Sequence, residues 1–285
     1  MMSAKVTIAI DNCVPINSAK PFLGEHGLSM LLDIGGKLLL LDTGQTGTVV
    51  HNLGLLGVAP SSLDAIALSH GHYDHTGGLP QVLERAGKRL PVYLHEKAFG
   101  EKYSDSRGTR RFVGIPTRPE RLAALGADFQ WVREPVECLP GLWLSGSVPR
   151  VTVFETGDAH LVAPDAARGC DCQDPLEDDM ALFCRTSRGL VVISGCTHSG
   201  LVNVVQHGLA VTGCQRLHGW IGGTHLGPVG EVQQAATLAQ LADYAPDFVA
   251  ANHCTGFAMM ARLQAVFGER FVPAFVGTEI VFETE

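Results

Sequence analysis

A dense cluster of potential metal ligands follows a short apolar segment. His70, His72, Asp74 and His75 fall within six residues, and the apolar run at 63–69 before them predicts a buried strand. In extended chain, residues two positions apart point the same way. We therefore expect His70 and His72 to face one metal ion, and Asp74 and His75 to turn towards a second. Imidazole and carboxylate ligands suit zinc, iron or manganese.

The rest of the chain alternates strand patterns with helix patterns. Strands are predicted at residues 6–10, 28–32, 37–41, 91–94, 180–184 and 190–194 and near positions 219, 248 and 271. Helices are predicted at residues 46–57, 79–86, 199–208, 230–243 and 256–267. No linker interrupts this rhythm, so residues 1–285 are expected to form one α/β domain with two sheets packed between helices.

Charge and composition limit the partners of the chain. A net charge of −8 argues against nucleic acid as a partner. No apolar stretch approaches the length of a membrane span, and the N-terminus lacks an apolar signal region, which together predict a cytoplasmic protein without membrane contact. The eight cysteines are scattered, so reduced thiols are expected rather than a disulfide framework. The sequence predicts no particular oligomeric state.

Residues 96–150 are less regular, and we expect them to form an insertion that covers the active site. They carry several arginines, of which Arg107, Arg110 and Arg111 are the candidates for binding a substrate phosphate. Guanidinium groups hold phosphate oxygens through paired hydrogen bonds. The alternative is that these arginines form a solvated face of a loop.

Three further histidines stand beside glycine at the ends of apolar runs. They are His198, His225 and His253. Each follows a predicted strand, and ligands collect at the carboxyl ends of strands in open sheets. A single histidine in such a position is more often structural than a ligand. The dense loop at 70–75 changes this expectation, because its metal ions need ligands from elsewhere.

The pattern His-x-His-x-Asp-His at 70–75 resembles the metallo-β-lactamase superfamily, as does Asp42-Thr43-Gly44 on the strand before it. Segments 26–29, 178–182, 195–200, 222–226 and 253–256 narrow the resemblance to the branch of 7,8-dihydropterin-6-methyl-4-(β-D-ribofuranosyl)aminobenzene-5′-phosphate synthases. The resemblance covers nearly the whole chain. It implies a four-layer αββα sandwich with metal ions at one edge of the sheets.

The resemblance also implies how two divalent metal ions are held. The second site takes a distant histidine, and its ligands are Asp74, His75 and His253. The first site is expected to be completed by a histidine from another segment, which gives His70, His72 and His198. Zinc is the leading expectation, with manganese, iron and magnesium as alternatives.

Three other residues are predicted to act near the metal ions. Asp42 is expected to orient a ligand histidine. Many members of the superfamily carry a bridging Asp where this chain has Cys196, which either binds metal as a thiolate or is packed in the core. His225 is expected to be a catalytic acid or a phosphate donor facing the substrate. The alternatives for His225 are a metal ligand in place of His198 and a buried, hydrogen-bonded side chain.

These observations predict a metal-dependent hydrolase or transferase acting on a phosphorylated small molecule. In hydrolysis, Asp74 would both bind metal and steer the attacking water. The resemblance implies a dihydropterin-methyl diphosphate that condenses with a ribofuranosylaminobenzene phosphate and loses pyrophosphate. One alternative is a hydrolase of phosphodiester, ester or lactone bonds. Another is a binding protein that senses metal or redox state, in which oxidation of Cys196 and Cys254 is the signal.

Overall fold

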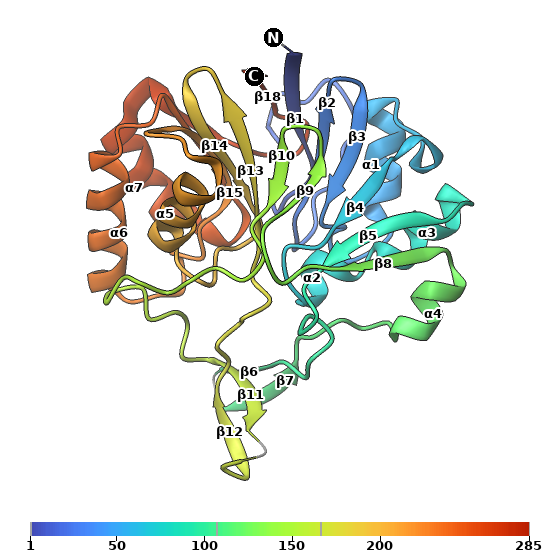
Figure 1. Ribbon diagram of the computed structural model, residues 1–285, viewed down its shortest axis with the longest axis horizontal. Coiled ribbons are helices and arrows are strands. Elements are labelled where there is room, and N and C mark those ends of the chain that lie inside the picture. The colour runs from blue at the N-terminus through green and yellow to red at the C-terminus, as the bar shows by residue number, and fades with distance from the viewer. Residues whose placement is uncertain (1, 107, 166, 285) are drawn as a thin grey trace.

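The computed structural model describes residues 2–284 apart from 107 and 166. Two seven-stranded sheets pack face to face, and helices cover the outer face of each (Figure 1). This is the four-layer αββα arrangement expected from the sequence. The two chain ends lie together at one end of the sandwich, and a small third sheet lies at the opposite end.

The first sheet combines an antiparallel meander with parallel strands. Its strands, in spatial order, are β18 (Glu279–Thr284), β1 (Met2–Ile10), β2 (Ser29–Ile34), β3 (Lys37–Leu41), β4 (Ala65–Ala67), β5 (Leu90–Leu94) and β8 (Ala127–Trp131). The strands from β18 to β3 pair antiparallel, and β3, β4, β5 and β8 pair parallel. The carboxyl ends of these parallel strands face the small sheet.

The second sheet has the same mixed character. Its strands, in spatial order, are β17 (Phe271–Pro273), β16 (Phe248–Asn252), β15 (Leu217–Gly223), β14 (Gly189–Ser194), β13 (Ala181–Thr186), β10 (Leu142–Leu144) and β9 (Val136–Leu139). The four strands from β14 to β17 are parallel. Helices α5 (Leu201–Thr212), α6 (Glu231–Asp243) and α7 (Phe257–Phe267) cover this sheet, and α1 (Thr48–Leu56), α3 (Leu79–Ala86) and α4 (Pro119–Ala124) lie beside the first sheet.

Short helices complete the described elements. They are α2 (Tyr73–Thr76) and three 3-10 turns, Pro60–Ser62, His253–Thr255 and Gly268–Arg270. Among the described residues, no helix combines the length and apolar character that a membrane crossing needs.

Buried apolar side chains form a layer between the sheets and another beneath each set of helices. Strand β3 shows how one sequence serves two layers. Leu39 and Leu41 belong to the layer between the sheets, whereas Leu40 belongs to the layer under the helices, and none is exposed. Burial of each such leucine contributes roughly 1.5–3 kcal/mol. The two-sided burial explains why this strand is a continuous apolar run.

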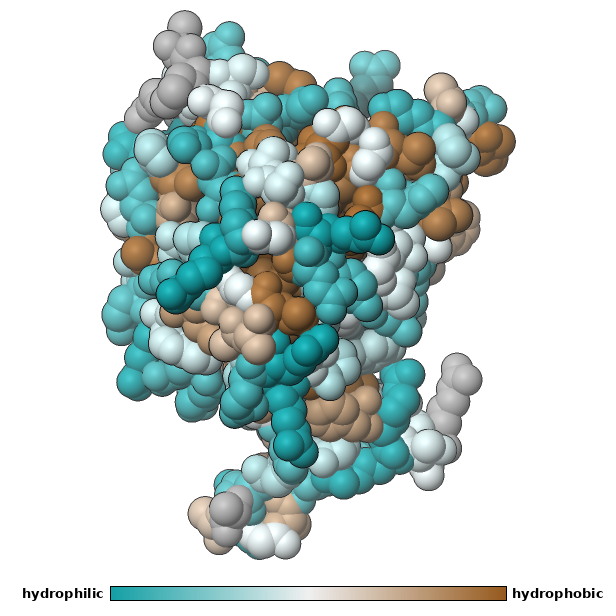
Figure 2. Space-filling view, turned by 90° about the vertical axis from the view of Figure 1, so that its right-hand side faces the viewer, coloured by the Kyte–Doolittle hydropathy of each residue, from teal (hydrophilic) through white to brown (hydrophobic). Residues whose placement is uncertain are grey.

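A four-stranded sheet projects from the sandwich as a separate lobe (Figure 2). Its strands, in spatial order, are β12 (Cys170–Gln173), β11 (Leu161–Asp165), β6 (Tyr103–Ser106) and β7 (Thr109–Phe112). The expected insertion at 96–150 is thus divided: residues 103–112 join this lobe, and the strands between 127 and 144 join the two large sheets. A single domain stays a prediction.

Candidate metal centre

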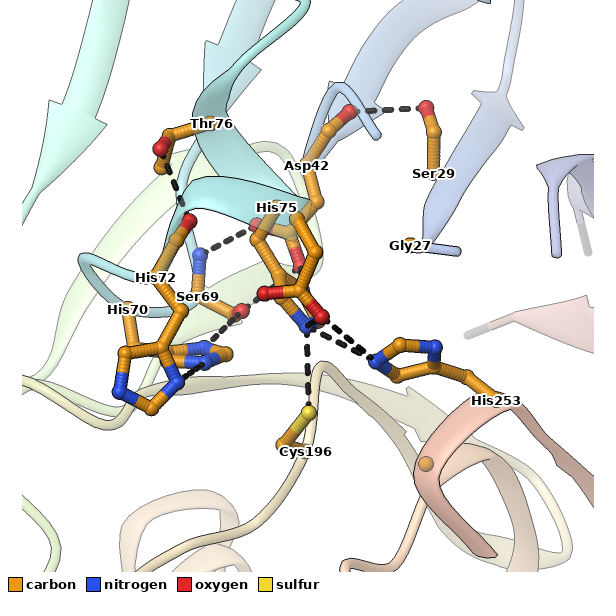
Figure 3. A network of polar contacts seen from close by, with 12 residues as sticks. Gly27, Ser29, Asp42, Ser69, His70, His72, His75, Thr76, Cys196 and His253 are labelled. Carbon is orange, nitrogen blue, oxygen red and sulfur yellow. Dashed lines mark hydrogen bonds and ion pairs between the residues drawn. The ribbon is translucent and has the colours of Figure 1, made fainter. Parts of the chain in front are cut away.

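The loop after β4 lies at the edge of the first sheet that faces the small sheet. It carries the four predicted ligands of the dense cluster, His70, His72, Asp74 and His75. The three histidines of this cluster are labelled in Figure 3. The chain changes from extended to helical after His72, where α2 begins. A Cβ at Gly71 would lie 1.9 Å from the carbonyl oxygen of Ala98, so only glycine fits there. The Gly71 N–H donates to Asp178 Oδ2 at 2.7 Å, which fixes the loop between His70 and His72.

The three distant histidines come from the second sheet. His198 follows β14, His225 follows β15 and His253 follows β16, and these strands are parallel neighbours. Because the carboxyl ends of parallel neighbours meet at one edge, segments far apart in sequence gather beside the loop. The structure therefore brings all three histidines to the same place.

The backbone of the centre is strained. Four non-glycine residues here have left-handed conformations, with φ of 58° at Asp42, 57° at Thr197, 45° at His225 and 48° at His253. Each costs roughly 1–3 kcal/mol, and such strain clusters at functional sites. The packing around these residues must hold the side chains in place against that cost.

One group of ligand atoms contains histidines from both sheets. The side chains of His70, Cys196 and His198 offer three atoms that all lie within 4.8 Å of one another. The ring centre of His198 is 4.7 Å from that of His70 and 4.9 Å from that of His72. The structure thus places His198 beside the two histidines that it is predicted to join.

A second group shares the same thiol. The side chains of His75, Cys196 and His253 offer atoms within 4.8 Å of one another. Cys196 Sγ lies 3.1 Å from His75 Nε2 (Figure 3). Asp74 Oδ2 lies 3.3 Å from His253 Nε2. Cys196 is therefore positioned between the two predicted ligand sets.

The donor atoms fit bound metal ions. Among the predicted ligands, three buried ring nitrogens have no hydrogen-bond partner in the described part of the chain: His72 Nε2 and both ring nitrogens of His198. Buried polar atoms are nearly always satisfied, so these unpartnered atoms indicate a bound ligand. Burial, reinforced by neighbouring histidines, lowers the pKa of His70 and His198 well below its usual value, and burial lowers the pKa of His72 to about 3. Neutral imidazole is the form that binds metal.

Asp42 contacts one predicted ligand histidine directly and a second one through Ser69. Its Oδ2 accepts hydrogen bonds from the Ser69 hydroxyl and from His75 Nδ1, each at 2.7 Å, and its Oδ1 accepts one from the Ser69 N–H. The Ser69 oxygen lies 2.9 Å from His70 Nδ1, so it relays the same carboxylate to a second ring. Burial alone would lower the pKa of His75, but Asp42 and Asp74 outweigh it and raise that pKa to about 9. A metal ion at His75 Nε2 must therefore displace a proton.

Other carboxylates and one amide fix the remaining segments. Asn12 Oδ1 accepts from His253 Nδ1 at 2.8 Å, and Asp11 Oδ1 accepts from the His253 N–H at 2.8 Å. Asp179 Oδ2 accepts from the N–H and the hydroxyl of Ser199, directly after His198. These contacts give the segment directly after β1 and the segment before β13 a positioning role at the centre.

His225 lies beside His198, with their ring centres 4.1 Å apart. Its Nε2 lies 3.4 Å from Asp158 Oδ2, and its backbone N–H donates to Cys254 Sγ at 3.1 Å. Burial would lower the pKa of His225, but Asp158 and Cys254 raise it to about 9. His225 is therefore protonated at neutral pH, as a proton donor requires. Its side chain also lies within 4.8 Å of Cys196 and Cys254, in a third group of ligand atoms.

Four of the predicted ligands, His72, Asp74, His198 and His253, line a pocket of about 160 Å³ that residues of the small lobe also line. Arg111 and His26 line its mouth, and His26 Nε2 lies 3.2 Å from Asp74 Oδ2. Arg110 faces the other side of β7, where it pairs with Asp171 and stacks over Tyr103 at 3.5 Å. Arg107 lies outside the described residues. Of the three predicted phosphate-binding arginines, the structure brings Arg111 to the pocket.

The fold and the site define the class of protein. The chain belongs to the metallo-beta-lactamase superfamily, whose sequence profile matches residues 24–162. It is 28% identical over 283 residues to the 7,8-dihydropterin-6-methyl-4-(beta-D-ribofuranosyl)-aminobenzene-5'-phosphate synthase of Methanocaldococcus jannaschii, with 92% of each chain covered. It is 32% identical over 276 residues to protein MJ0448 of the same organism, with 95% of this chain and 98% of that protein covered.

Solved structures support the fold. Tm1679, described as a metal-dependent hydrolase of the beta-lactamase superfamily, aligns with a TM-score of 0.79 at 23% identity and covers 99% of this chain and 100% of its own. Zinc-bound PqqB from Methylobacterium extorquens aligns with a TM-score of 0.57 at 16% identity, covering 97% and 99%. At these identities the likeness shows the αββα fold alone.

Sequence reasoning missed His26, which lines the pocket, and Asp158, which contacts His225. His26 lies in segment 26–29, one of the segments that resemble the synthase branch, so the sequence contained a signal that could have identified it. Asp158 lies in an irregular stretch between β10 and β11, where no periodic pattern marks it. Only the tertiary structure brings Asp158 to His225.

Proposed function

We propose that the protein binds two divalent metal ions and acts on a phosphorylated small molecule. The observation that carries the proposal is the convergence of buried imidazoles from both sheets on one thiol, Cys196. Beside them, ring nitrogens of His72 and His198 have no hydrogen-bond partner among the described residues. The first set is His70, His72 and His198, and the second is Asp74, His75 and His253, with Cys196 beside both. Zinc suits this mixture of imidazole and thiolate best.

The side chains around the pocket suit the binding of an anionic substrate. Arg111 stands at the mouth, with its guanidinium 5.4 Å from the ring centre of Tyr73. A planar guanidinium there can hold phosphate oxygens through paired hydrogen bonds. A second pocket of about 400 Å³ meets the first at His198, so a substrate larger than a phosphate group has room to extend.

The remaining groups suit a reaction that expels a phosphate-type leaving group. When bound, two divalent ions would stabilise negative charge on the leaving oxygens. His225 can donate a proton from Nδ1, and Asp158 holds its ring through Nε2. Full-length similarity to the pterin-related synthase favours a dihydropterin-methyl diphosphate as donor and a ribofuranosylaminobenzene phosphate as acceptor, with pyrophosphate released.

The test combines elemental analysis with two assays. Purified protein is expected to carry two metal ions per chain, and it should release pyrophosphate from the pterin diphosphate only when the acceptor is present. Release without acceptor would identify a hydrolase instead. Metal-loaded protein that releases nothing would contradict the proposed substrate class.

Matched variants test the ligand assignment. His70→Ala should lose metal and activity, whereas His51→Ala, an exposed histidine on α1, should keep both. Full metal content in His70→Ala would overturn the two-metal centre.

A further inference from the structure

The centre contains a second thiol that the proposed ligand sets do not use. Cys254 lies in the 3-10 turn directly after His253, and Cys196 follows β14. Both line the same pocket, and their sulfur atoms lie within 4.8 Å of each other. Cys196 is buried, and Cys254 is partly exposed to the pocket.

The strand between the two cysteines leaves room for the sulfurs to meet. Gly223, at the end of β15, lies between the segments that carry them. A Cβ at Gly223 would lie 2.8 Å from Cys254 Sγ and 3.5 Å from Cys196 Cα. Because glycine has no side chain, the space between the thiols contains no side chain from the intervening strand.

We propose that Cys196 and Cys254 form a reversible disulfide on mild oxidation, and that this bond removes the thiol shared by the two ligand groups. A buried thiol and a more exposed thiol line the same pocket, through which a small oxidant can reach them. The effect on the centre rests on the proposed function, whereas bond formation itself does not.

The chemistry balances with hydrogen peroxide as the oxidant. The sulfur of Cys254, the more exposed thiol, attacks one peroxide oxygen, the O–O bond breaks, and a sulfenic acid and one water form. The sulfur of Cys196 then displaces the sulfenic oxygen, which leaves as a second water. Two thiols lose two electrons and two protons, and the peroxide gains them. A dithiol reductant reverses the change through a mixed disulfide.

Oxidation should change the metal centre through Cys196. A sulfur in a disulfide carries no thiolate charge, and its lone pairs bind zinc weakly compared with a thiolate. Since Cys196 belongs to both the His70 group and the His75 group, one bond weakens two sites together. Oxidised protein is therefore expected to release metal.

The experiment treats apo and zinc-loaded protein with hydrogen peroxide and maps the product by proteolysis and mass spectrometry. The expected result is a peptide pair joined through Cys196 and Cys254, lighter by two hydrogens than the reduced pair, with release of bound zinc. Dithiothreitol should restore both thiols. Cys254→Ser should form no such peptide pair. Its zinc content after peroxide treatment should equal its own zinc content before treatment. Cys170→Ser, which removes an exposed thiol on β12, should behave as wild type.

Three outcomes would overturn the inference. One is over-oxidation of both cysteines without a joined peptide. Another is equal zinc release from wild type and Cys254→Ser. The third is a zinc ion bound by Cys196, Cys254 and His225 that keeps both thiols reduced. If the apo protein forms the joined peptide but neither wild type nor the variants bind zinc, the disulfide is supported and the proposed two-metal function is contradicted.

Discussion

Asp42 connects the ligands of both predicted metal sites to one buried carboxylate. It holds His75 directly and His70 through Ser69. Removing an outer carboxylate of this kind typically lowers metal affinity by roughly 10–100-fold. Asp42→Asn keeps the shape but loses the charge, so we expect a loss in this range, measured by competition with a chromogenic chelator. Asp243→Asn, exposed at the end of α6, should leave affinity unchanged, and equal affinity in both variants would contradict the role of Asp42.

Lys102 makes a buried contact with the segment that fixes the metal loop. Its Nζ lies 2.7 Å from Asp178 Oδ1 and 3.4 Å from Asp174 Oδ2, and its side chain is only 5% exposed. Burial would lower the pKa of Lys102, but the two carboxylates raise it above 10.5. The folded pKa thus exceeds the unfolded one, so the contribution to stability is full below pH 10.5 and is lost as the pH rises through the folded value.

Removing the Lys102 ammonium leaves two buried carboxylates without their partner. Lys102→Met is expected to reduce the free energy of unfolding by roughly 3–5 kcal/mol at neutral pH, measured by urea denaturation. The difference from wild type should shrink above pH 10.5. A difference that stays constant at high pH would show that lost packing, and not the ion pair, is responsible.

At the scale of elements, the predictable helices and strands are those in which apolar residues recur at one regular spacing. Helix α3 is predicted at 79–86 and observed at Leu79–Ala86, because its buried residues Leu79, Val82, Leu83 and Ala86 follow the helical spacing. Strand β8 was not predicted, although its apolar and polar residues alternate, because it is only five residues long and only its first residue is fully buried. The hairpin of β6 and β7 is mostly exposed, so its pairing leaves little trace in hydrophobicity.

Successive side chains of strand β7 point to opposite faces of the small sheet, so the neighbouring residues Arg110 and Arg111 face different surroundings. Arg111 faces the pocket, and Arg110 pairs with Asp171 on the other face. Arg111→Ala is expected to raise KM for a phosphorylated substrate about tenfold, as the loss of one charge-assisted contact implies. Arg110→Ala should change KM little. Steady-state kinetics of the two variants check this, and a larger effect at Arg110 would reverse the assignment.

At the scale of the molecule, the candidate site joins the two halves of the sandwich. The loop at 70–75 comes from the first sheet, and Cys196, His198 and His253 come from the second. The local ligand loop could be identified from its spacing, as could the three histidines at strand ends. The contacts of Asp158, His26 and Gly223 could not, because they depend on how distant loops pack against one another. The sequence therefore indicates which residues bind metal more fully than it indicates which residues surround the substrate pocket.

Because its ligands come from both sheets, metal should stabilise the whole sandwich and not one loop. A ligand that binds only the folded state adds RT ln(1 + [L]/Kd), about 2.7 kcal/mol when its concentration is 100-fold above Kd. For a chain of this size each kcal/mol raises Tm by roughly 2–4 °C. Chelation is thus expected to lower Tm by several degrees, and added zinc to restore it, in differential scanning calorimetry. His253→Ala should show a smaller shift on chelation than wild type. An unchanged shift in that variant would mean that the second sheet contributes no ligand at His253.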